Sequence, residues 1–115
     1  GHCIPIDPWF IVHADPKNSD LIRTARLVND AMPSRTAKRI QEAIRVASVG
    51  ADASTEFSAN KHRVVAVGAT YKPDVADTRE SPASQVVEEL RLLGFNVTHI
   101  DPHVQAMTYS GTLAK

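Results

Sequence analysis

The chain has 115 residues, of which 43% are hydrophobic and 23% are charged, and its 13 Lys and Arg balance its 13 Asp and Glu. This length and composition predict one globular domain, and the balanced charge without a basic run argues against a nucleic-acid or anionic-membrane partner. One cysteine cannot form an internal disulfide, and neither an apolar stretch of about 18 residues nor a signal-peptide pattern occurs, so we expect a cytoplasmic protein. Because the first residue is not methionine, we also expect a piece of a longer chain.

Residues 1–18, which read GHCIPIDPWFIVHADPKN, contain three prolines and predict an irregular or extended arm that has room for one short helical turn. Cys3 is its reactive group, since a thiolate attacks a carbonyl carbon readily, although a lone cysteine is more often a small buried apolar residue. His2, Cys3 and His13 could also be drawn as metal ligands, but their spacing matches no zinc motif. We therefore predict no metal site.

Residues 19–49 predict one long helix with a kink. Asn18 or Ser19 offers an N-cap oxygen, Gly50 is a natural stop, and Pro33 either ends or kinks the helix because it lacks an N–H. The stripe of largely small residues favours close packing against another helix, and we expect that helix to come from a second subunit. The apolar residues recur every three or four positions on both sides of the proline: Leu21, Ala25, Val28, Met32, Ala37, Ile40, Ile44 and Ala47.

The remainder predicts a linker followed by part of an α/β domain. Residues 50–61 are small and polar and have no period, which is typical of a linker. The run RVVAVG predicts a buried parallel strand, SPASQVVEELRLLGF a helix that Ser81 caps and Gly94 stops, and FNVTHID a second strand. Together they form one βαβ unit over residues 62–102, and we expect residues 103–115 to be a disordered tail. The predicted fold class is α/β, with a long kinked helix followed by a partial Rossmann-like unit.

A charged loop, ATYKPDVADTRE, follows the first strand. Ligands of open α/β sheets bind outside the carboxyl ends of the strands, and Lys72, Asp77 and Arg79 all follow such an end. Lys72 can meet a phosphate as a point charge, Arg79 can clamp one with its fork of N–H donors, and the first turn of the next helix also attracts anions. The alternative is a solvated loop in which Asp77 and Arg79 pair. No GxGxxG occurs, so this unit is not by itself a dinucleotide fingerprint.

Three motifs in register, GHCIPIDPWFIV, LIRTARLVNDAMP and VVAVGATYKPDVADTRESPA, resemble the nucleotide-sugar dehydrogenases, the family that includes UDP-glucose and GDP-mannose dehydrogenases. The resemblance covers roughly residues 1–102. The aliphatic residue, Pro and Asp-Pro that follow Cys3 look most like the branch that acts on UDP-N-acetylhexosamines. Ile6 stands where the glucose-acting branch commonly has Lys, which argues against UDP-glucose.

The resemblance implies an NAD-dependent oxidoreductase that converts the C6 hydroxymethyl group of a UDP-sugar to a carboxylate in two steps. Cys3 matches the cysteine that attacks the aldehyde-level intermediate, which gives a thiohemiacetal and then a thioester that water releases. Asp7 matches an acidic residue that helps to position water or the proton-transfer groups. Lys72 matches a lysine that contacts the UDP-sugar, and Arg79 matches an arginine that reaches toward NAD.

The resemblance also implies parts that this chain lacks: a glycine-rich NAD domain before Gly1 and the rest of the UDP-binding sheet after residue 102. Residues 19–49 correspond to the central helix that joins two nucleotide-binding domains and builds a homodimer. We therefore expect an inactive fragment of an enzyme of bacterial or archaeal cell-surface polysaccharide synthesis. Two alternatives stay open, namely a different UDP-sugar (UDP-glucose, UDP-GalNAc or UDP-GlcNAc) and a dimerising remnant without catalysis.

Overall fold

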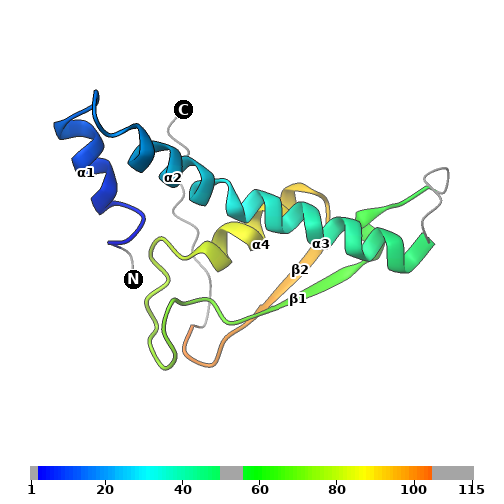
Figure 1. Cartoon of the computed structure of the whole chain (residues 1–115). Coiled ribbons are helices and arrows are strands. Elements are labelled where there is room, and N and C mark those ends of the chain that lie inside the picture. Colours follow the sequence, from blue (N-terminus) through cyan, green and yellow to red (C-terminus); the bar gives the residue numbers. More distant parts are fainter. Residues whose placement is uncertain (1–2, 50–55, 105–115) are drawn as a thin grey trace.

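A computed structural model of the chain describes residues 3–49 and 56–104. In Figure 1, α2 and α3 run as one bent rod across the molecule, the βαβ unit lies alongside the α3 half, and α1 folds back beside α2. The predicted α/β class, with a long kinked helix and a partial sheet, is confirmed. In chain order the elements are α1 (Asp7–Ala14), α2 (Asp20–Asp30), α3 (Met32–Val49), the 3-10 turn η1 (Ala59–Lys61), β1 (Arg63–Val67), α4 (Pro82–Leu92) and β2 (Asn96–Ile100).

The predicted kink separates α2 from α3 at Ala31. Pro33 lies in the first turn of α3, where its missing N–H removes no intrahelical hydrogen bond. The Ala31 amide donates to the Leu27 carbonyl, and the Arg35 amide donates to the Ala31 carbonyl, both at 3.1 Å. Helical hydrogen bonds therefore continue on both sides of the kink, and the two helices form one rod. Ser19 holds the predicted N-cap position of α2, but its hydroxyl makes no capping hydrogen bond.

Residues 7–14 form a helix where the sequence predicted an irregular arm, so that prediction was wrong. Trp9, Phe10, Ile11 and Val12 are consecutive, and such a helix shows no apolar period that would reveal it. Local features favour it instead, because Pro8 in the first turn has a preset φ and needs no N–H partner, while acidic residues are stabilised at a helix N-terminus. α1 packs against α2.

The core lies between α3, α4 and one face of the sheet. β1 and β2 pair in parallel, with Val65 opposite Thr98, and the inward side chains alternate along both strands. Gly94, at φ +90°, ends the α4 segment as predicted, because this left-handed backbone suits a residue without Cβ. The buried cluster is Ala37, Val87, Leu90, Phe95 and Val97, with Ile40, Ile44, Phe57, Ala59, Val64, Ala66, Val86 and Leu93 packed on it.

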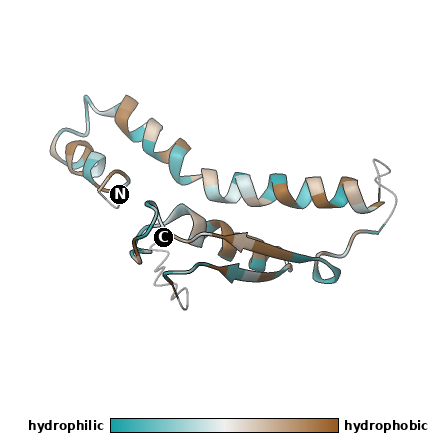
Figure 2. Cartoon of the chain, turned by 90° about the horizontal axis from the view of Figure 1, so that it is seen from below, coloured by the Kyte–Doolittle hydropathy of each residue, from teal (hydrophilic) through white to brown (hydrophobic). Residues whose placement is uncertain are grey.

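The first strand is buried on one face only, which corrects the prediction of a fully buried strand. Val65 and Val67 are 48% and 81% exposed, because the helices of this chain cover the opposite face of the two-stranded sheet. Figure 2 shows hydrophobic segments along both strands and on α1. Half of the predicted linker (residues 50–55) and most of the predicted tail (residues 105–115) lie outside the described residues, and part of the linker forms η1.

Candidate functional site

The carboxylate of Asp101 links the segments that follow β1 and β2 by hydrogen bonds. Asp101, directly after β2, accepts a hydrogen bond from the Ala69 amide at 2.9 Å and others from the amides of His103 at 2.8 Å and Val104 at 3.1 Å. The His103 bond is the largest influence that lowers the pKa of Asp101, followed by those from Ala69 and Val104, and burial opposes them. Sequence reasoning missed this residue, although an acid at the end of a parallel strand is a usual signal of a ligand-binding edge.

The loop between β1 and α4, residues 68–81, carries both Lys72 and Arg79. The Thr70 hydroxyl donates to the Lys72 carbonyl at 2.7 Å, and the Tyr71 hydroxyl donates to the Glu80 carbonyl. Both cationic side chains point away from the core, since Lys72 is exposed and the Arg79 side chain is 71% exposed. The loop is thus internally bonded while it presents its cations to solvent.

Arg79 is paired with Asp77, which is the arrangement that the sequence left open as an alternative. Its Nε and Nη2 atoms donate to the two carboxylate oxygens at 2.8 and 2.7 Å. The hydrogen bonds and charge of Asp77 raise the pKa of Arg79, and the negative charge of a Cys3 thiolate acts in the same direction. The pair fixes the plane of the guanidinium and leaves it at the surface, where a bound anion can reach it.

The opening loop places Cys3 directly before α1. The Cys3 carbonyl accepts hydrogen bonds from the amides of Ile6 at 3.0 Å and Asp7 at 2.8 Å, which closes a turn that leads into the helix. The thiol is free and exposed, so Cys3 is not the small buried residue that composition alone favours. Asp7 begins α1 and is exposed as well.

The opening loop meets the loop that carries Arg79. Figures 1 and 2 both place the start of the described chain beside the turn that leads into α4. Pro5 of the opening loop lines one cleft of about 130 Å³ together with Glu80 and Pro82, and the kink between α2 and α3 forms its other wall. The structure thus brings the Cys3 and Arg79 segments together. Within the described ranges, however, no hydrogen bond or ion pair links Cys3 or Asp7 to Lys72 or Arg79, and none links Lys72 to Arg79.

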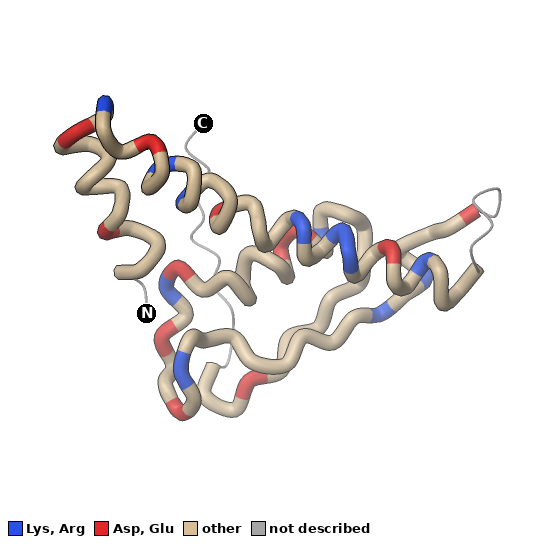
Figure 3. Tube along the Cα trace, viewed as in Figure 1, with Lys and Arg blue, Asp and Glu red and all other residues tan. Residues whose placement is uncertain are grey.

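Charged residues of both signs lie around the loop between β1 and α4 in Figure 3. α4 begins at Pro82, and Ser81 holds the predicted N-cap position. The Ser81 hydroxyl is buried and has no hydrogen-bond partner, so the predicted capping bond is not formed. The mixed charge suits a ligand that carries both phosphate and hydroxyl groups better than it suits a polyanion.

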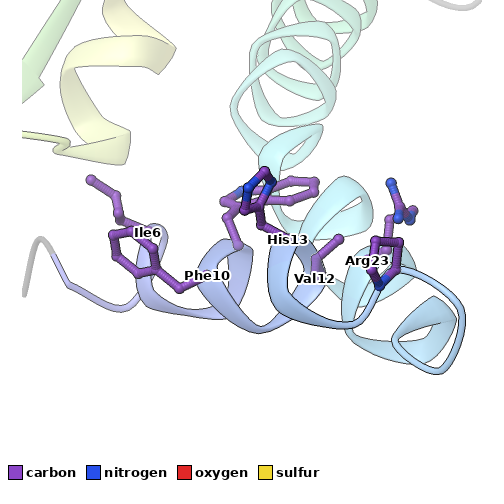
Figure 4. A pocket seen from close by; sticks show the side chains of 7 residues that line it. Ile6, Phe10, Val12, His13 and Arg23 are labelled. Carbon is purple, nitrogen blue, oxygen red and sulfur yellow. The ribbon is translucent and has the colours of Figure 1, made fainter.

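A second hollow, of about 600 Å³, lies between α1 and the start of α2 and is shown in Figure 4. Its walls are apolar apart from His13 and Arg23. An apolar wall of this kind accepts hydrophobic side chains and lacks the convergent polar groups of a nucleotide site. The lining residues are Ile6, Trp9, Phe10, Val12, His13, Pro16 and Arg23.

Among residues 3–49 and 56–104, no group of three or more His, Cys, Asp or Glu side chains lies together in a way that could hold a metal ion. His2, one of the residues considered as a ligand, lies outside that range. None of the helices in the described part of the chain is both long and apolar enough to cross a membrane.

Known proteins resemble this chain in sequence over nearly its whole length. Residues 65–113 match the UDP-binding domain of the UDP-glucose/GDP-mannose dehydrogenase family. Over 109 residues, 95% of its length, the chain is 43% identical to UDP-N-acetyl-D-mannosamine dehydrogenase from Methanocaldococcus jannaschii. The chain belongs to the UDP-glucose/GDP-mannose dehydrogenase family.

Two further members of this dehydrogenase family extend the match. The chain is 40% identical, over 93% of its length, to NDP-N-acetyl-D-galactosaminuronic acid dehydrogenase from Ralstonia nicotianae. A solved structure, UDP-N-acetyl-mannosamine dehydrogenase from S. aureus, covers 92% of the chain with a TM-score of 0.67 and 37% identity. The chain spans 22% of the archaeal relative and 23% of each of the other two, which is less than a quarter of their lengths.

Proposed function

We propose that this chain is the central segment of an NAD-dependent UDP-N-acetyl-D-mannosamine 6-dehydrogenase. The observation that carries the proposal is that the exposed Cys3 lies in a loop that meets the Arg79 segment at the carboxyl edge of the sheet. Relatives named as dehydrogenases of UDP-N-acetyl-D-mannosamine match the chain over 95% and 92% of its length. The product would serve cell-surface polysaccharide synthesis in the cytoplasm.

The reacting group of the proposed mechanism is the Cys3 sulfur. As a thiolate it attacks the C6 aldehyde carbon, a C–S bond forms, and the carbonyl oxygen takes a proton to complete the thiohemiacetal. That carbon then loses a hydride and the hydroxyl loses its proton, which leaves a thioester. Water adds to the thioester carbon, the C–S bond breaks, and the carboxylate leaves while the thiolate is restored. A covalent adduct keeps the aldehyde from diffusing away between the two oxidations.

Asp7 and Lys72 take supporting roles in this proposal. Asp7 starts the helix that follows the Cys3 turn, and its exposed carboxylate is available to orient the hydrolytic water. Lys72 is exposed at the other end of the carboxyl edge and would contact the diphosphate of the UDP-sugar as a point charge.

The residues at this edge fit a nicotinamide cofactor through Arg79, whose exposed guanidinium is held in plane by Asp77 and suits a phosphate oxygen. When bound, NAD accepts one hydride in each of the two oxidations. Arg79 would orient that cofactor from the loop between β1 and α4. The glycine-rich pyrophosphate loop of a dinucleotide site is absent from this sequence, so Arg79 alone cannot confer tight binding.

The proposed partner of the central helix is a second copy of the protein. On α2 and at the start of α3, Leu21, Val28 and Met32 are 83%, 48% and 41% exposed and follow one helical stripe. An apolar stripe of this kind is stable in water when another helix covers it. A homodimer through residues 19–49 would cover this exposed stripe.

The test is production of NADH by the full-length protein that contains this segment, supplied with UDP-N-acetyl-D-mannosamine and NAD. We expect steady turnover with two NADH formed per sugar, and a loss of at least about a thousandfold in rate for Cys3→Ser, because the alkoxide of serine is a far poorer nucleophile at neutral pH. The chain alone should give no sustained rate above that of Cys3→Ala. Full activity in the Cys3→Ser protein would exclude the mechanism.

Two alternatives are decided by the same assay. The Ralstonia relative is named for a galactosaminuronic acid, so UDP-GalNAc, UDP-GlcNAc and UDP-glucose are compared as substrates through their kcat/KM. A dimerising remnant would show no NADH with any of these sugars, and its Cys3 thiol would not be protected from alkylation by UDP-sugar.

A further inference from the structure

We propose that Tyr71 is a positioning residue that sets the separation of Lys72 and Arg79, the two cations of the carboxyl edge, and this inference rests on the function proposed above. The Tyr71 hydroxyl donates to the main-chain carbonyl of Glu80 across nine residues. Tyr71 is the neighbour of Lys72 in the chain, and Glu80 is the neighbour of Arg79. One hydrogen bond therefore ties together the two ends of the loop.

The backbone at the accepting end needs such a restraint. Glu80 has a φ of +52°, in the left-handed region that residues with a Cβ seldom adopt. A residue persists in this region when its surroundings determine it. The Tyr71 bond to the Glu80 carbonyl is one such contact, and the bond from the Ser81 amide to the Thr78 carbonyl, at 3.2 Å, closes the same turn.

Other parts of the chain surround the hydrogen bond between Tyr71 and Glu80. Tyr71 and Glu80 line the cleft of about 130 Å³ whose other walls are Pro5 of the opening loop and Arg26 and Pro33 at the helix kink. Burial, and then the charge of Glu80, raise the pKa of Tyr71, while the charge of Arg26 lowers it. The phenol therefore keeps its proton and stays a donor at neutral pH.

A second bond restrains the other cation locally. The Thr70 hydroxyl donates to the Lys72 carbonyl at 2.7 Å, so the two neighbours of Tyr71 in the chain are bonded to each other. Lys72 and Arg79 are exposed and make no contact with each other, and their relative placement follows from the main chain that carries them. A ligand that meets both cations gains affinity when that placement is fixed before it binds.

The experiment compares Tyr71→Phe with wild type in the full-length dehydrogenase that contains this segment. Phenylalanine keeps the ring and removes the hydroxyl. We expect the Kd for the UDP-sugar and the KM for NAD to rise about three- to tenfold, the usual effect of one hydrogen bond, with a smaller change in kcat. Thr78→Val is the matched control, because it removes a hydroxyl of the same loop that makes no hydrogen bond.

A merely structural role would lower the melting temperature and leave ligand affinity at 25 °C unchanged, and that result overturns the proposal. Hydrogen exchange of the ligand-free protein gives a second, independent readout. The amides of residues 72–80 should exchange faster in Tyr71→Phe than in Thr78→Val, and equal protection would also overturn it. If wild type binds no UDP-sugar and forms no NADH, the proposed function fails, whereas hydrogen exchange still decides whether Tyr71 fixes the loop.

Discussion

The two halves of the central helix carry the same kind of apolar stripe and meet different surroundings. In α3, Ala37 is fully buried and Ile40 and Ile44 pack on the core that α4 and the sheet provide. In α2, Leu21 is 83% exposed, and the buried residue of the helix is Arg26. An amphipathic pattern therefore predicts that a helix has a face suited to burial. It does not predict whether the same chain buries that face, as it does in α3, or leaves it exposed, as in α2.

The largest effect should come from the core that covers α3, to which Leu90 of α4 belongs. Leu90 is 2% exposed at the centre of the core, so Leu90→Ala should lower the free energy of unfolding by about 2–5 kcal/mol, because a buried leucine is replaced by a cavity. Leu21→Ala, the matched change on the uncovered half, should alter it by less than about 0.5 kcal/mol.

Urea unfolding measures the free energy of unfolding of both variants. Sedimentation of Leu21→Ala tests the proposed dimer, which should dissociate at a higher protein concentration than the wild-type dimer does. Equal losses of stability in the two variants would show that the halves are covered alike.

A smaller effect is expected at the buried arginine of the uncovered half. Arg26 pairs with Asp30 and donates to Asn29 at 3.1 Å, and its side chain is 8% exposed. Arg26→Ala should lower the free energy of unfolding by about 1–3 kcal/mol through lost packing and lost hydrogen bonds.

Arg26→Met keeps much of the volume of the side chain, and replacement of a buried ion pair by apolar groups is often close to neutral. We expect it to recover most of the loss in thermal and urea unfolding. A methionine variant as unstable as the alanine variant would show that the charge, and not the packing, stabilises this part of α2.

The smallest effect should appear at Asp101, directly after β2, and should depend on pH. The amides that bond Asp101 lower its pKa below the ordinary value of 3.8. Since the folded-state pKa is the lower one, this stabilisation is complete above the unfolded-state pKa and is lost as pH falls through the folded-state pKa. In Asp101→Asn the melting temperature should be lower than in wild type at pH 7, and the gap should narrow on acidification toward pH 3. A difference in melting temperature that stays constant from pH 7 to pH 3 would contradict the conclusion that the charged Asp101 carboxylate stabilises the fold.

The elements with a clear local signal could be predicted. Ser81 and Pro82 start α4, and Gly94 follows its end, because N-cap, first-turn and left-handed positions each favour particular residues. α1 was missed since it is apolar all round and so has no period. Cys3, Asp7, Lys72 and Arg79 were chosen from the sequence, and their roles remain predictions. Asp101 and Tyr71 were not chosen, because their significance lies in bonds to Ala69 and Glu80.

By itself the sequence determined the local elements after α1, the kink before Pro33 and the family to which the chain belongs, because helix capping, proline chemistry and short motifs act over a few neighbouring residues. Tertiary structure alone decided that the Cys3 loop meets the Arg79 segment and that Tyr71 bonds to Glu80. It also decided that one half of the apolar stripe is covered and the other is not. The physical reason is that burial and hydrogen bonding between distant segments depend on how helices pack on the sheet, which no local pattern encodes.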